Sequence, residues 1–261
     1  MMTCRTRLNC RNLSRCGKSA NLSVLGGAFV FPKHFQRDMT TPDTDKRLAA
    51  AAAVDEVCDN MLVGLGTGST AAHAIALLAE RRLNIETVAT SQASADLATR
   101  LGLKVRPFDA VARIDLAIDG ADAIDGRLRA VKGAGGAMLR EKVVAASADR
   151  MIVIADGSKR NRRLGAMPLP VEVLPFARGF ASLRLAQIFV RCVERPDYRT
   201  DNGNVVIDGH GWDDNAPGSL ADALMAIPGV VGHGLFLSEV DAAYIADQGI
   251  VTRLERGSNP R

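Results

Sequence analysis

The 261-residue chain has no long apolar run, which excludes a helix that crosses a membrane. Its apolar stretches, such as "MIVIAD" at residues 151–156, have the length of a buried strand, whereas a spanning helix needs about 20 apolar residues. The overall composition, 47% hydrophobic and 24% charged, is typical of a globular protein. We therefore expect no membrane partner.

Aromatic residues are also scarce, at 4% of the chain. Residues 1–37 hold seven basic residues and no acid, so the remaining chain has 26 basic and 29 acidic residues despite the net charge of +4. Apart from "KRNRR" at residues 159–163, the sequence has no basic stripe, and few aromatic rings are present to stack on bases. We expect no nucleic-acid partner.

Cysteine and histidine are too few and too scattered for a disulfide scaffold or a zinc site. Three of the five cysteines lie within the first 16 residues, Cys58 and Cys192 are far apart, and the four histidines are isolated. No C-x-x-C pair occurs. The sequence predicts reduced thiols, a cytoplasmic location and no bound metal.

The leader, residues 1–38, has no acid before Asp38 and has the composition of an organellar transit peptide; it can equally be an extension upstream of the true initiator, Met39. We favour the second interpretation because a chain that starts at Met39 begins just ahead of the first predicted helix. Either way, we expect the leader to lie outside the working fold. Residues 39–167 form the predicted main domain, residues 168–238 a small α+β domain, and residues 239–261 return strands and a tail.

The main body alternates helical and strand-like segments, which predicts an α/β fold: an open, Rossmann-like, mostly parallel sheet with helices on both faces. Helices are predicted at residues 45–58, 69–82, 92–102 and 137–148, and strands at residues 61–66, 85–90, 104–108, 116–120 and 151–156. The small domain is predicted to be ferredoxin-like, with strands at 171–175, 205–209 and 230–236 and helices at 180–193 and 219–227. Residues 241–247 and 250–255 read as strands that return to the main sheet.

The loop "VGLGTGST" at residues 63–70 has the strand–turn–helix order in which backbone amides and a helix N-terminus attract an anion. The glycines alone are also compatible with a plain tight turn. A dinucleotide site would place an acid after the next strand, where Thr90 and Ser91 stand, and a P-loop would place a lysine after Gly68. The loop therefore favours a smaller phosphate ester, held by Thr67, Gly68, Ser69 and Thr70.

A second cluster of chemically active residues follows another predicted strand. "DGAD" brings Asp119 and Asp122 to a strand end, and "VKGAGGA" adds Lys132 and glycine amides before a helix that carries Glu141. Singly, each residue fits a solvated turn or an exposed helix face. Together, they offer a carboxylate base, two acids, a cation and oxyanion-binding amides, which suit proton transfer beside a carbonyl. This chemistry needs neither a metal nor a redox cofactor.

Several motifs in register resemble type A ribose-5-phosphate isomerase from about residue 46 to about residue 254: "GLGTGSTAAHA", "DGADAIDG", "KGAGGAMLREK", "IADGSK", "PLPVEVLP", "TDNGNVVID" and "IPGVVGHGLF". The resemblance implies interconversion of ribose 5-phosphate and ribulose 5-phosphate through a cis-enediolate, in the non-oxidative pentose phosphate pathway. It also implies that no cofactor is needed and that the protein is a homodimer or homotetramer.

The resemblance also assigns roles to residues. Glu141 matches the general base, Asp119 and Asp122 match acids at the sugar oxygens, and Lys132 matches the group that steadies the enediolate. The implied substrate-binding residues are Thr67, Gly68, Ser69, Thr70, Gly120, Ala121, Gly133, Ala134, Gly135, Lys159 and Lys46.

The chain departs from the family pattern at Ala123, where a glutamate is usual, at Ala134, where a glycine is usual, and in a short segment before "TDNGN". A sugar-phosphate-sensing effector domain is the alternative function, although residues 1–45 lack the paired helices of a helix-turn-helix. A phosphosugar deaminase or a coenzyme A transferase on a similar sheet is a third possibility. The pairing of "DGAD" with "KGAGGA" favours the isomerase.

Overall fold

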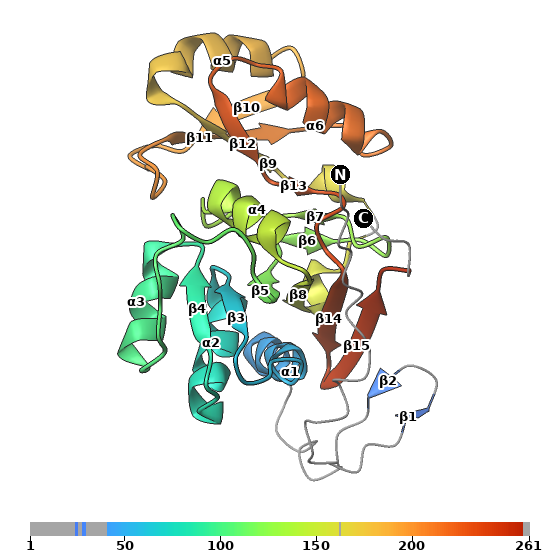
Figure 1. The fold of residues 1–261 in the computed structure, drawn as a ribbon. Helices are drawn as coiled ribbons and strands as arrows, with labels where there is room; N and C mark the ends of the chain where they lie inside the picture. The colour runs from blue at the N-terminus through green and yellow to red at the C-terminus, as the bar shows by residue number, and fades with distance from the viewer. Residues whose placement is uncertain (1–23, 26–27, 30–40, 162, 258–261) are drawn as a thin grey trace, which may run out of the picture.

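The computed structural model describes residues 24–25, 28–29, 41–161 and 163–257. Its main sheet has eight strands in the order β1-β2-β15-β14-β8-β5-β3-β4 (Figure 1). These strands are β1 (Val24–Leu25), β2 (Ala28–Phe29), β3 (Leu62–Leu65), β4 (Glu86–Ala89), β5 (Leu116–Gly120), β8 (Met151–Asp156), β14 (Ala242–Asp247) and β15 (Ile250–Glu255). The strands from β14 to β4 run parallel, and β15 pairs antiparallel with β14.

Helices cover both faces of this sheet, as predicted. On one face, α1 (Pro42–Val54) and α2 (Ser69–Arg81) pack over alternate residues of the central strands, among them Ile118 and Ile152. On the other face, α4 (Met138–Ser147) packs over the intervening residues, such as Ala117 and Val153. Strands buried on both faces have continuous apolar sequences, which is why β5 and β8 were predicted with their observed bounds.

Local capping and turn chemistry move several predicted boundaries. The first helix begins earlier than predicted because the Thr41 hydroxyl accepts the Thr44 amide at 3.2 Å and caps it. Helix α3 (Gln92–Arg100) ends close to the predicted position. The prediction of a strand at residues 104–108 is wrong: that segment makes only a single bridge, between Val105 and Thr87.

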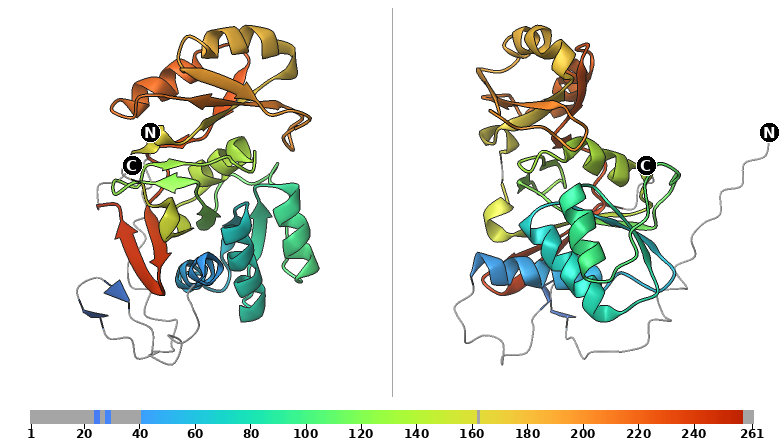
Figure 2. Two further views of the ribbon diagram at one scale, coloured as in Figure 1. Left: turned by 180° about the vertical axis from the view of Figure 1, so that it is seen from behind. Right: turned by 90° about the vertical axis from the view of Figure 1, so that its left-hand side faces the viewer.

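The small domain stands at one end of the main sheet (Figure 2). Its four-stranded sheet has the order β10-β11-β9-β12, and β13, β7 and β6 form a separate three-stranded sheet. The elements are β6 (Ala123–Ile124), β7 (Ala130–Val131), β9 (Leu169–Val173), α5 (Arg178–Leu185), β10 (Arg191–Glu194), β11 (Val205–His210), α6 (Pro217–Met225), β12 (Val230–His233) and β13 (Leu235–Phe236). Helices α5 and α6 lie on the side turned away from the main domain (Figure 1).

The predicted helix at residues 180–193 is wrong in its second half. Helix α5 ends at Leu185, and residues 191–194 instead form the edge strand β10, antiparallel to β11. The β-branched and aromatic side chains between residues 188 and 193 favour a strand over a continued helix. The resulting β-α-β-β-α-β order is that of a ferredoxin-like domain.

Most of the leader lies outside the described residues. Its two described pieces, β1 and β2, form a hairpin whose second strand pairs with β15 through two residue pairs. No strand was predicted there. Within the described ranges, no helix combines the length and apolar character that crossing a bilayer requires.

Candidate active site

The predicted site residues meet at the carboxyl edge of β3 and β5, where open α/β sheets bind ligands. They line a cavity of about 150 Å³. Its lining residues are Lys46, Thr67, Gly68, Ser69, Thr70, Gly120, Ala121, Asp122, Lys132, Gly133, Ala134, Gly135, Glu141 and Lys159. Asp119 is the one predicted site residue not in this lining; it lies behind it, buried against Lys132.

One side of the cavity is built to hold an anion. Helix α2 starts after Gly68, which has φ of +102° and offers no side-chain cap to the first amides of the helix. The Lys46 ammonium donates to the Ser69 hydroxyl at 3.1 Å, and Lys159 lines the same space. Uncapped amides, a helix N-terminus and two lysines together favour a phosphate group.

The Thr67 side chain is held from behind by hydroxyl groups that sequence reasoning did not assign. Its oxygen lies 2.8 Å from the Thr90 hydroxyl and 2.8 Å from the Ser91 hydroxyl. Ser91 also caps helix α3 by accepting the Ser94 amide at 3.2 Å. Thr90 and Ser91, which stand where a dinucleotide site would carry an acid, therefore support the loop around Thr67.

Three charged side chains form a buried cluster beneath the cavity. The Lys132 ammonium lies 2.9 Å from Asp119 Oδ2 and 3.5 Å from Glu141 Oε1, and each of the three is at most 5% exposed. It also donates to the Gly120 carbonyl. Asp119 Oδ1 in turn accepts the Thr67 and Gly120 amides at 3.0 and 2.7 Å. Asp119 therefore ties the anion-binding loop to the lysine.

Glu141 has the environment of a general base. Burial, together with the negative charge of Asp119, raises its pKa to about 8, against the opposing effect of Lys132. Glu141 Oε2 is buried and has no hydrogen-bond partner among the described residues. A carboxylate with a raised pKa and an unoccupied oxygen beside a cavity is equipped to accept a proton.

Lys132 remains a cation in spite of its burial. Desolvation alone would lower its pKa, but the carboxylates of Asp119 and Glu141 hold the pKa above its ordinary value. The lysine also faces the buried ring of Phe236, 5.6 Å from the ring centroid. A fixed positive charge in a dry site stabilises a nearby oxyanion strongly.

Residues 133–136, which we name the glycine loop, contribute Gly133, Ala134 and Gly135 to the cavity lining. Asp122 accepts the Ala134 amide at 2.8 Å and so fixes the loop next to the cavity. Gly133 and Gly136 have φ of +104° and +78°, and Ala134 is not among the residues with positive φ. Alanine in place of the usual glycine is thus unstrained at residue 134. The other departure, Ala123, is fully buried in the core of the small domain.

Two residues that contact this loop were not predicted. Arg195 and Tyr198, from the segment after β10, donate to the carbonyls of Ala134 and Gly135. No local motif indicates such contacts, because they depend on how the two domains pack together.

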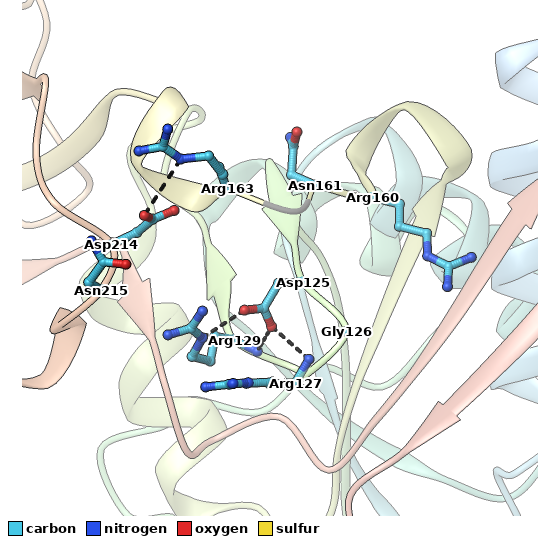
Figure 3. A pocket seen from close by; sticks show the side chains of 9 residues that line it. All are labelled: Asp125, Gly126, Arg127, Arg129, Arg160, Asn161, Arg163, Asp214 and Asn215. Carbon is cyan, nitrogen blue, oxygen red and sulfur yellow. Dashed lines mark hydrogen bonds and ion pairs between the residues drawn. The ribbon is translucent and has the colours of Figure 1, made fainter.

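A second, larger cleft of about 1020 Å³ lies elsewhere, lined by Asp125, Gly126, Arg127, Arg129, Arg160, Asn161, Arg163, Asp214 and Asn215 (Figure 3). Its one buried acid, Asp125, is saturated by the Arg127 and Arg129 amides and the Arg129 guanidinium. This cleft offers no unoccupied base. Among the described residues, no group of histidine, cysteine or acidic side chains is arranged to hold a metal ion.

Comparison with known proteins agrees with the geometry. The family model of ribose 5-phosphate isomerase A (phosphoriboisomerase A) matches residues 86–249. The chain is 49% identical over 220 residues to a ribose-5-phosphate isomerase A from Sphingopyxis alaskensis, covering 82% of this chain and 96% of that protein. It is 47% identical over 221 residues to one from Roseiflexus castenholzii, covering 80% and 94%.

Solved structures show the same similarity. The ribose 5-phosphate isomerase A of Neisseria gonorrhoeae superposes with a TM-score of 0.81 at 35% identity, covering 84% of this chain and 99% of that one. A D-ribose-5-phosphate isomerase in complex with phospho-erythronic acid has a TM-score of 0.80 at 33% identity, covering 83% and 100%. The chain therefore belongs to the ribose 5-phosphate isomerase A family.

Proposed function

We propose that Glu141 is the base that carries a proton between C2 and C1 of the open-chain sugar as ribose 5-phosphate and ribulose 5-phosphate interconvert. The observation that carries this proposal is the unpartnered, buried Oε2 of Glu141 at the cavity. Its raised pKa matches the need for a base that is strong near neutral pH and still able to return the proton.

The proton and electron movements follow from this placement. Glu141 takes the C2 proton, and the electrons of the C–H bond form a C1–C2 double bond while the C1 carbonyl oxygen becomes an oxyanion. Lys132 stabilises that charge, and the oxygen gains a proton as the O2 hydroxyl loses one. Asp119 and Asp122 transfer these oxygen-bound protons and assist the opening of the sugar ring. Glu141 then returns its proton to C1, which leaves the ketose.

The N-terminus of α2, with Lys46 and Lys159, is the proposed phosphate site. Free ribose should then be a very poor substrate, and inorganic phosphate or sulfate should compete with ribose 5-phosphate. We also propose that phospho-erythronic acid binds here, its phosphate at α2 and its carboxylate near Lys132. Similar kcat/KM values for ribose and its phosphate would contradict the assignment.

The alternative of a sensing domain without catalysis predicts binding without turnover. The test is to incubate the purified chain with ribose 5-phosphate in the presence of a chelator and to follow ribulose 5-phosphate. An isomerase produces it. A sensor binds the sugar phosphate and leaves it unchanged.

We further propose that the chain forms a homodimer or homotetramer through the outer face of the small domain. Phe176, Phe180 and Leu183 follow one another at helical i, i+4, i+7 spacing, and their exposed fractions are 101%, 52% and 66%. Such an apolar stripe on the surface marks a protein contact. Sedimentation should show an oligomer that Phe180→Asp dissociates. The same change at the exposed Ile250 of the main domain should leave the oligomer intact.

The proposed location is the cytoplasm. The scattered cysteines of the sequence, with no C-x-x-C pair, fit a reducing compartment. The basic leader leaves an organelle as the alternative, and cell fractionation with an antibody to the chain distinguishes the two compartments.

A further inference from the structure

The second domain reaches into the active site through one segment, residues 195–204. This segment follows the edge strand β10 and lies against the glycine loop. Nothing in the proton-transfer scheme uses it. Its contacts nevertheless fall on Ala134 and Gly135, which line the cavity.

Arg195 makes three hydrogen bonds at once, to the Asp208 carboxylate and the Ala134 carbonyl. Its Nε and Nη2 donate to the two oxygens of Asp208 at 2.8 and 2.7 Å, which fixes the plane of the guanidinium. Its Nη1 donates to the Ala134 carbonyl at 2.9 Å. A lysine, with one ammonium group, cannot reproduce this arrangement.

Tyr198 holds the next carbonyl of the loop. Its hydroxyl donates to the Gly135 carbonyl at 2.9 Å, and the Arg195 guanidinium lies 5.8 Å from its ring centroid. A Cβ on Gly136 would lie 1.8 Å from the Tyr198 oxygen, so the loop and the tyrosine fit together only with glycine there. The fit is specific to these two residues.

The segment that carries these side chains is itself anchored. Glu172, which is fully buried on β9, accepts the Thr200 hydroxyl at 2.8 Å and the Asn204 amide group at 2.9 Å. Asn202 and the Asp201 carbonyl each accept an N–H of Arg140, both at 2.8 Å; Arg140 precedes the base on α4. Arg195 and Tyr198 therefore act from a fixed support.

Because a peptide unit is planar, these contacts with two carbonyls also set the directions of the amides that follow them. In a trans peptide the C=O and the following N–H point in opposite directions. A donor that pulls the Ala134 carbonyl away from the cavity therefore turns the Gly135 amide toward it. In the same way, Asp122 holds the Ala134 amide. The loop is closed by the Gly136 amide, which donates to the Gly133 carbonyl at 2.9 Å, and Arg195 and Tyr198 hold the two peptide units that flank Gly135.

We propose that Arg195 and Tyr198 are positioning residues that fix the peptide units on either side of Gly135 and so orient the Gly135 amide toward the oxygens of the enediolate. This inference rests on the proposed function. It predicts that the small domain contributes to kcat without touching the substrate. The contribution appears in the transition state, where the oxygens carry the most charge.

The test compares the only two tyrosines of the chain. Tyr198→Phe removes the hydroxyl that holds the loop, and Tyr244→Phe removes a hydroxyl that bonds Glu56 at 2.6 Å in the main domain. We expect Tyr198→Phe to lower kcat about tenfold with KM within about twofold, and Tyr244→Phe to leave kcat unchanged. Tm is measured for both variants to separate folding from positioning.

Two inhibitors locate the effect. Tyr198→Phe should weaken the binding of phospho-erythronic acid by a factor similar to its loss of kcat. Inhibition by inorganic phosphate, which is proposed to bind at α2, should stay the same. Arg195→Lys should behave likewise, and Arg191→Lys, an exposed residue of β10, should match the wild-type protein.

The outcomes separate the two proposals. A purely structural contact would give a Tyr198→Phe variant with a lower Tm and the wild-type kcat. That result would show that the positioning role is wrong. If the wild-type chain itself does not isomerise ribose 5-phosphate, the proposed function fails first. An equal loss of affinity for phosphate and phospho-erythronic acid also contradicts the inference, because it places the effect at the other end of the cavity.

Discussion

Glu141 and Lys132 show how burial determines chemistry at the scale of single residues. The same low-dielectric environment raises the pKa of the acid and, through the neighbouring carboxylates, keeps the lysine charged. Asp119, Asp122, Lys132 and Glu141 were predictable from the sequence, because they stand in two glycine-containing motifs, one at the end of a predicted strand and one that runs into a predicted helix. The role of the Thr90 and Ser91 hydroxyls was not predicted, since their contact with Thr67 joins two loops that are separate in the sequence.

The raised pKa of Glu141 predicts the pH dependence of the reaction. Only the carboxylate accepts the carbon-bound proton, so kcat/KM should rise with pH and level off above about pH 8. Initial rates measured across this range at low substrate concentration report the free enzyme. A plateau already reached near the ordinary pKa of a glutamate, about 4.3, would show that burial does not control the base.

The same shift predicts how stability depends on pH. Because the folded state holds the Glu141 proton to a higher pH than the unfolded state does, its contribution to stability is present at low pH and is lost as pH rises toward about 8. In Glu141→Gln, this pH-dependent loss of stability should be absent, because an amide does not titrate. We expect the Tm of the variant, relative to wild type, to increase between acidic and alkaline buffers in calorimetry. A constant difference in Tm would contradict the assignment.

At the scale of elements, the site depends on the close approach of β3 and β5. Their ends were predictable because both strands are continuous apolar runs followed by glycine or acid. The β10 strand was not predicted, because residues 188–193 directly continue a helical pattern, although their β-branched and aromatic side chains favour the strand that pairs with β11. Arg195 and Tyr198 follow β10, so their role was hidden by the same ambiguity.

Gly66 tests this close approach. A Cβ there would lie 2.0 Å from Asp119 Oδ1 and 2.5 Å from the Asp119 Cα, which is backbone and cannot move aside. We expect Gly66→Ala to lower stability by about 1–3 kcal/mol or more and to reduce kcat as Asp119 is displaced. Gly218→Ala in α6 is the control, because its methyl group meets no atom within 4 Å. Urea unfolding and steady-state kinetics of both variants give the comparison; equal behaviour would refute the prediction.

At the scale of the whole molecule, the catalytic residues come from the main domain and the supports of the glycine loop come from the small domain. The fold class followed from the alternation of strands and helices along the sequence. The packing of one domain on the other did not, because it results from contacts between residues that are far apart in the chain.

Removal of the leader, residues 1–38, tests how much of the chain the fold needs. The described β1–β2 hairpin pairs with β15 through only two residue pairs, and its residues are not among those that line the cavity. We expect a protein that starts at Met39 to keep the kcat and Tm of the full chain. Calorimetry and kinetics on the two proteins side by side measure this. A large fall in either quantity would show that the leader is part of the working fold.

The central claim is that Glu141 moves the carbon-bound proton. Proton NMR of ribose 5-phosphate incubated in D2O with wild-type protein or Glu141→Gln tests it most directly, since an amide keeps the shape of the side chain but cannot accept the proton. The account predicts ribulose 5-phosphate with deuterium at C1 from the wild type, and neither product nor exchange at C2 from the variant, although the variant still binds the sugar phosphate. Isomerisation by Glu141→Gln within about tenfold of the wild-type rate, equivalent to less than about 1.4 kcal/mol of barrier, would contradict it.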